Sequence, residues 1–163
     1  MPADNIFDIK VQELQKEWDE WGSKILAEIA SISRLQWHEK EIIVYLTGGV
    51  RPYSDPLTLN LRSTIDTLTH ELIHRILTEP ENWRLFKNSW EELMQKYSQE
   101  PEKTRTHVIV HAIHTPILKN LFGEERYQKE RNSMTSPDYV RAWEIVDRDG
   151  YEDIIKELTA ELN

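Results

Sequence analysis

The sequence contains no cysteine, and it has only five glycines and seven prolines among its 163 residues. Without cysteine the chain can form neither a disulfide framework nor a thiolate metal site, and it has no thiol nucleophile. The scarcity of glycine and proline, together with six tryptophans and six tyrosines, argues against disorder. Any bound metal ion must therefore be held by nitrogen and oxygen atoms, in a chain long enough to bury a core.

Positive charge is also in short supply, because 20 basic residues stand against 29 acidic ones and the formal net charge is -9. Nucleic acids and anionic membrane surfaces attract clustered Lys and Arg, so we expect neither as a partner. The first residues, Met1 to Asn5, lack the basic and apolar segments of a secretory signal, and no apolar run is long enough for a membrane span. These absences predict a soluble, cytoplasmic protein.

The N-terminal part of the chain has the apolar spacing of a long amphipathic helix. Apolar residues recur at steps of three and four as far as Ile32, and Asp4 or Asn5 is a plausible N-cap. Glycine inside a helix costs about 1 kcal/mol relative to alanine. We therefore expect a break or kink at Gly22-Ser23, giving either one bent helix or two stacked ones.

A short β region and a well-marked helix follow. Residues 41–46 are apolar and β-branched, and residues 57–61 alternate apolar with polar, so both segments are predicted to be strands. We expect the two strands to form a small antiparallel sheet. Ser63 and Asp66 have the spacing of a capping box, which predicts a helix over 64–78.

The rest of the chain is predicted to be helical, and nothing in it suggests a second domain. The expected helices cover 82–99, 102–122, 124–131, 137–148 and 151–162. The predicted fold is α+β and mainly α-helical, with a small sheet before the central helix and other helices packed around it. Its parts within a single domain 1–163 are the N-terminal segment 1–36, the sheet 41–61, the helices 63–123 and the C-terminal helices 124–163.

The predicted helix 64–78 carries the sequence His70-Glu71-Leu72-Ile73-His74. Two histidines four residues apart lie about 40° apart around a helix and one turn along it, so both imidazoles can reach one cation. Glu71 lies beside that face, where it can act on water rather than ligate the metal. The opposite face carries an independent apolar stripe, formed by Ile65, Leu68, Leu72 and Ile76.

A catalytic zinc usually needs a third protein ligand, and most of the remaining histidines lie in one later helix. His107, His111 and His114 fall within an arc of about 60° on the predicted helix 102–122, among apolar residues. We expect His111 to be the third ligand, because it is the middle one and Ala112 beside it permits close helix packing. His107, His114 and a carboxylate remain alternatives, Glu144 being the best of the carboxylates.

Three other residues are weaker candidates. Asp66 lies one turn before His70 and could orient that ring, although capping is the simpler explanation. Tyr127 and Tyr139 could each supply a hydroxyl group to a developing oxyanion. His38, the sixth histidine, is expected to be an ordinary surface residue.

The motif His70-Glu71-x-x-His74, on a helix preceded by a small sheet, resembles the zincin metallopeptidases, especially their small, minimal members. The looser likeness runs from about residue 41 to residue 122. The resemblance implies zinc (Zn2+) at His70 and His74, and Glu71 as the general base. It also implies a peptide lying antiparallel along an exposed edge strand, for which 41–46 and 57–61 are the candidates.

The chain departs from two large zincin groups. The metzincin pattern would need glycine at 77 and histidine at 80, where this chain has Leu77 and Pro80. The thermolysin-like pattern needs a downstream Glu-x-x-x-Asp, and none follows His74 at a suitable spacing. A histidine is therefore the expected third ligand.

These observations predict a zinc metallopeptidase that hydrolyses peptide bonds in a peptide or protein substrate by metal-activated water, with Glu71 as general base. The alternative is a helical interaction module in which zinc only stabilises the fold. Such a module would not need Glu71. A third possibility is a metal-free interaction protein built on the long N-terminal helix.

Overall fold

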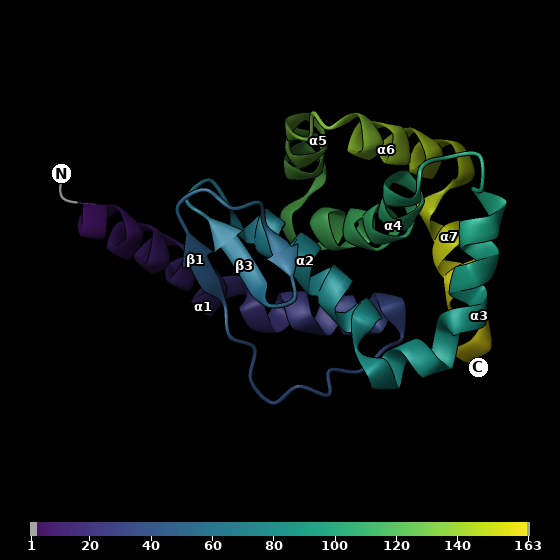
Figure 1. Ribbon diagram of the computed structural model, residues 1–163, viewed down its shortest axis with the longest axis horizontal. Coiled ribbons are helices and arrows are strands. Elements are labelled where there is room, and N and C mark those ends of the chain that lie inside the picture. Colours follow the sequence, from purple (N-terminus) through teal and green to yellow (C-terminus); the bar gives the residue numbers. More distant parts are fainter. Residues whose placement is uncertain (1–2, 163) are drawn as a thin grey trace.

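The computed structural model describes residues 3–162, which form seven α-helices, a three-stranded mixed sheet and a short 3-10 helix (Figure 1). The predicted class, α+β and mainly helical, is confirmed. The helices are α1 (Ala3–Ser33), α2 (Ile65–Thr78), α3 (Pro80–Lys96), α4 (Glu102–Phe122), α5 (Glu124–Ser133), α6 (Pro137–Asp149), α7 (Tyr151–Leu158) and the 3-10 helix η1 (Ala160–Leu162). The strands are β1 (Tyr45–Thr47), β2 (Tyr53–Ser54) and β3 (Leu57–Asn60).

Helix α4 lies at the centre of the molecule and contacts each of the six other α-helices (Figure 1). It spans the predicted residues 102–122. Its side chains are buried on all sides, as the run of apolar residues around the histidines predicts; those with no exposed surface include Val108, Ile109, Val110, Ala112 and Ile113. The other helices are packed so that they cover α4.

Helix α1 is one unbroken helix, so the kink predicted at Gly22-Ser23 is wrong. Asp4 and Asn5 lie inside α1, so neither is its N-cap. A Cβ atom added at Gly22 would lie 2.5 Å from the ring of Trp18 one turn earlier. Gly22 therefore serves packing, because only glycine leaves room for the indole ring at this point of the helix.

The sheet differs from the predicted antiparallel pair. Its strand order is β1-β3-β2; β1 pairs parallel with β3, and β2 pairs antiparallel with β3. The chain between β1 and β3 makes an extra strand, β2, which forms the hairpin with β3 and leaves β1 to pair on the other side. Only the end of the predicted strand 41–46 joins the sheet. β3 is the central strand and offers no free edge.

Helix α2 begins one residue later than predicted, with a different cap. Thr64 is the N-cap, and a reciprocal capping box joins it to Thr67, with N–H to Oγ1 distances of 3.3 Å and 3.2 Å. Ser63 instead accepts a hydrogen bond from the backbone N–H of Asn60. Asp66 forms an ion pair with Arg126 of α5. The predicted apolar stripe of α2 is nevertheless buried, at Ile65, Leu68, Leu72 and Ile76.

The later helices match their predicted positions closely. α3 starts at Pro80, because proline fits the first turn of a helix, where its missing N–H costs nothing. Gly123 and Gly150 have φ angles of 85° and 82° and end α4 and α6. Among residues 3–162, no helix is both long and apolar enough to cross a bilayer.

We predict that Gly22→Ala destabilises the protein by about 1–3 kcal/mol, because a methyl group would force Trp18 out of its position. The gain in helix propensity, about 1 kcal/mol, opposes this loss without cancelling it. Gly49→Ala is the control, since a Cβ atom there meets nothing within 4 Å. Denaturant unfolding measures both variants, and a G22A protein as stable as the wild type would contradict the packing role.

Candidate metal centre

Two helices bring three histidines together at one point. His70 and His74 of α2 and His107 of α4 each offer a ring nitrogen, and these three atoms lie within 4.8 Å of one another. The two histidines of the motif and one histidine of the predicted later helix therefore form a group that could hold a metal ion. Within the described part of the chain, the third member of this group is His107 and not the expected His111.

His70 lies at the middle of a larger cluster of five imidazoles. Its ring centroid is 5.0 Å from that of His74, 5.4 Å from His107, 5.6 Å from His111 and 5.7 Å from His114. His74 is the most exposed of the five, whereas His111 and His114 have no exposed surface. The cluster thus extends from a partly open end at His74 into the core.

The hydrogen bond made by His107 leaves one of its ring nitrogens free for a metal. Its Nδ1 lies 2.7 Å from the backbone carbonyl oxygen of Lys103, one turn earlier in α4. A carbonyl only accepts hydrogen bonds, so Nδ1 carries the proton and Nε2 keeps its lone pair. Ligating histidines commonly have such a partner, which fixes the tautomer and the orientation of the ring.

His111 has a different environment. Its ring stacks on that of Trp143 of α6, with a centroid distance of 4.2 Å and an interplanar angle of 15°. Both of its ring nitrogens are buried without a hydrogen-bond partner. It lies 5.6 Å from His70 and 5.6 Å from His107, behind the group of three. The geometry therefore favours His107 over His111 as the third ligand.

The ring nitrogens of His70 and His114 are also buried without hydrogen-bond partners. Buried polar atoms are nearly always satisfied in folded proteins, so each exception needs a reason. A metal ion at His70 would satisfy one of its two nitrogens. The unpaired ring nitrogens of His70 are therefore consistent with a cation bound at this position.

All five clustered histidines are neutral at pH 7. Burial lowers the pKa of His74 and of His114 to about 3, and it is the main cause that lowers the pKa of His70, His107 and His111. The neighbouring imidazoles lower the pKa of His70 further, because a second positive charge nearby is unfavourable. Neutral imidazoles have free lone pairs, which is the state that metal binding requires.

Glu71 lies on α2 beside the histidines and is not a member of the ligand group. Its side chain is buried, and burial raises the pKa of its carboxyl group to about 7. Tyr139 of α6 lies against the same site, with its ring 4.2 Å from that of His107. Burial and the charge of Glu71 raise the pKa of Tyr139, so its hydroxyl group stays protonated.

Several sequence candidates lie outside the centre. Asp66 is paired with Arg126 and makes no hydrogen bond to His70. Glu144 is exposed and paired with Arg141 at 2.9 Å, away from the group of three. Tyr127 lies in a separate apolar cluster with Leu118 and Trp143, and His38 is exposed as predicted.

Sequence reasoning missed two features of the centre. The stacking of Trp143 on His111 depends on how α4 and α6 pack, whereas the bond from His107 to the Lys103 carbonyl lies within α4. The apolar pattern of 139–146 marks Trp143 as a core residue without saying which helix it meets. The i−4 carbonyl of His107 is available in any helix, so that bond was in principle foreseeable.

Comparison with known proteins gives no relative: no protein-family model, no curated protein and no solved structure matches this chain. The assignment of a metal centre therefore depends on the positions of His70, His74 and His107.

If the group of three holds a metal ion, we predict that His107→Ala weakens binding of added Zn2+ at least tenfold, because it removes one of the three nitrogens, and that His111→Phe weakens it less. Phenylalanine keeps a ring to stack on Trp143 and removes only the nitrogens. Competition with a chromophoric chelator measures both affinities, and His38→Ala serves as the surface control. Loss of binding in H111F with normal binding in H107A would show that His111 is the third ligand.

We also predict that the metal-free protein loses stability as the pH falls from about 6.5 towards 3. The unfolded chain binds protons on its histidines near pH 6.5, whereas folded His74 and His114 resist protonation down to about pH 3, and burial also holds the pKa values of His70 and His111 well below 6.5. In this window, each such histidine lowers the free energy of unfolding by about 1.4 kcal/mol for every unit by which the pH falls. Glu71 and Glu130, whose pKa values are raised to about 7, oppose part of the effect.

Denaturant unfolding with chelator present, between pH 7.5 and 5.5, measures this dependence. Bound zinc should protect the protein, because ligated histidines cannot take up protons. If the free energy of unfolding of the metal-free protein is constant over this range, the conclusion that the clustered histidines are buried in their neutral form is wrong.

Proposed function

We propose that this protein is a zinc-dependent hydrolase of peptide bonds. The observation that carries the proposal is the convergence of His70, His74 and His107 beside the buried carboxyl group of Glu71. Three nitrogen ligands with a nearby carboxylic acid are typical of catalytic zinc sites, in which the fourth position is left for water. Neutral imidazoles are suitable ligands for zinc, as they are for copper, iron and nickel.

The three histidines would hold the ion, with His107 fixed by its bond to the Lys103 carbonyl. When bound, zinc supplies a Lewis acid that lowers the pKa of a coordinated water towards neutrality. A dication near Glu71 would also lower the pKa of this carboxyl group from about 7, because opposite charges stabilise each other. Glu71 would then be ionised and able to act as a base.

Glu71 accepts a proton from the attacking water and later delivers it to the leaving amine. Once it has taken up the proton, the same carboxyl group is the acid that returns the proton to the leaving amine. Tyr139, whose ring lies 4.2 Å from that of His107 and whose hydroxyl group stays protonated, would donate a hydrogen bond to the developing oxyanion. The site thus contains a base and a hydrogen-bond donor from two different helices.

An extended substrate peptide would pair with the free edge of β2. Of the two expected candidate strands, 57–61 corresponds to β3, which has partners on both sides. β1 and β2 are the edge strands, and β2 packs against α2. Strand addition at β2 would therefore bring a peptide to the metal-binding helix.

We predict that Glu71→Gln keeps one zinc per chain but lowers kcat/KM for a quenched fluorescent peptide by about 10²–10⁴, because the general base is lost. Glu130→Gln is the matched control. Its side chain is half-buried and the pKa of its carboxyl group is also raised to about 7, but it interacts with Asp66 and Arg126. Full hydrolysis by E71Q, or an equal loss in E130Q, would refute the role of Glu71.

The second candidate is a helical interaction module that zinc only stabilises. One observation favours it: the ring of His111 lies 5.6 Å from both His70 and His107, so a fourth nitrogen ligand is close to the group. Four protein ligands would leave no position for water. In this case H111F should weaken zinc binding as strongly as H107A, and the wild type should hydrolyse no peptide.

A further inference from the structure

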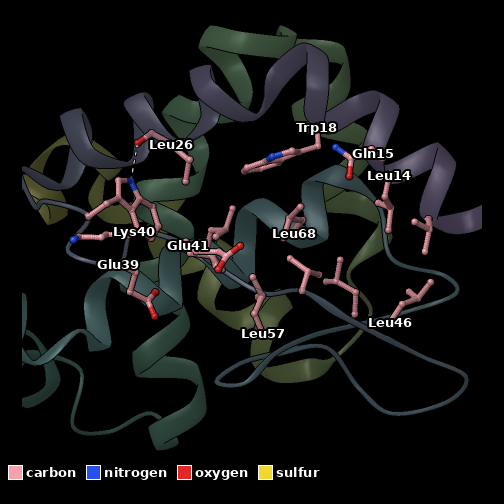
Figure 2. Close-up of a pocket in the computed structure, with 16 residues that line it drawn as sticks. Leu14, Gln15, Trp18, Leu26, Glu39, Lys40, Glu41, Leu46, Leu57 and Leu68 are labelled. Carbon is pink, nitrogen blue, oxygen red and sulfur yellow. Dashed lines mark hydrogen bonds between the residues drawn. The ribbon is translucent and has the colours of Figure 1, made fainter.

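A cavity of about 550 Å³ lies on the opposite side of α2 from the histidines. Figure 2 shows it between α1 above and the strand region below, with Glu41 towards one end and Leu46 towards the other. Leu68 and Leu72 of α2 line the cavity, whereas His70 and His74 project from the other face of the same helix. The cavity is therefore distinct from the metal centre.

Most of the lining is apolar, with Leu14 and Trp18 on α1 facing Leu57 and Leu59 on β3. The cavity is open to solvent along one side, since Val11 and Val44 of its lining are 51 % and 43 % exposed. This space would hold roughly eighteen waters at about 30 Å³ each, and no side chain of residues 3–162 fills it. Cavities of this size and character are typical of small-molecule sites.

The few polar groups at the cavity are unevenly placed. Glu39 is engaged outside it, by two hydrogen bonds from the guanidinium of Arg75. Lys40 points away from the cavity, whereas the carboxylate of Glu41 points into it (Figure 2). Glu41 is exposed at the mouth of the cavity, and among the described residues it has no ion-pair or hydrogen-bond partner. The free charge that faces the apolar space is thus negative.

We propose that this cavity binds a small molecule with an aliphatic or aromatic body and a protonated amine at one end. The apolar body lies between α1 and β3, against Trp18 and Trp37, and the ammonium group faces Glu41. Charge complementarity selects the amine, because a carboxylate at the same place would be repelled by Glu41. This binding needs no metal ion and does not depend on the hydrolase function.

A series of ligands with one chain length tests the proposal. Octylamine, octanol and octanoate are titrated into the purified protein by calorimetry, with tryptophan fluorescence as a second readout, since Trp18 and Trp37 line the cavity. We expect saturable binding of one octylamine per chain, at least tenfold tighter than octanoate. Glu41→Gln should reduce the preference for octylamine over octanol to less than twofold.

A pair of tryptophan substitutions separates the cavity from the surface beside it. Val44 lines the cavity and is 43 % exposed, so Val44→Trp can fill the space without disturbing the core. Ile43→Trp adds the same ring at the adjacent residue, which is 58 % exposed and does not line the cavity. We expect V44W to bind octylamine at least tenfold more weakly than the wild type does, and I43W to bind it as tightly as the wild type does. Thermal denaturation should show that both variants are folded.

Three outcomes would overturn the proposal. The first is that no compound of the series binds saturably to the wild type. The second is that octanoate binds more tightly than octylamine, or that V44W binds octylamine as well as I43W does. The third is a dimer, seen by analytical ultracentrifugation, that V44W dissociates while no alkyl compound binds, because a second copy of the chain would then be the occupant.

Discussion

The structure depends on burying histidine side chains, because they belong to a helix that is covered on all sides. Helix α4 contacts every other α-helix, yet three of its buried residues are His107, His111 and His114. Such rings can be buried only when they are neutral, because a buried charge without a partner is far more costly than a buried neutral group. Burial lowers the pKa values of these three rings, and all three lie between 5.4 Å and 5.7 Å from His70, measured between ring centroids.

Helix α2 has its histidines on one face and apolar side chains on the opposite face. Its histidines face α4, where nitrogen atoms are concentrated, and Leu68 and Leu72 face the cavity beneath α1. The helix can serve both sides because its reciprocal cap at Thr64 and Thr67 fixes where it begins and therefore which residues face each way. A shift of one residue would rotate the pattern by about 100° and separate the ligands.

Much of the fold, and the motif pair, could be predicted from the sequence. The boundaries of α4 and the buried stripe of α2 follow from apolar spacing and from Gly123, which are local signals. The parallel pairing of β1 with β3 could not be predicted, because it depends on the path of the chain between them. The preference for His107 over His111 could not be predicted either. All three histidines of α4 share one face, and only the angle at which α2 crosses α4 decides which of them meets His74.

Arg75 follows His74 directly in α2, and its guanidinium holds both carboxylate oxygens of Glu39 and the carbonyl oxygen of Ser54. Glu39 belongs to the wall of the cavity, and Ser54 belongs to the edge strand β2. One side chain thus connects three parts of the molecule: the last turns of α2, the cavity wall and the sheet edge. A displacement of the cavity wall must either stretch this connection or pull on the helix next to His74, so the two faces of α2 are mechanically connected although they share no side chain.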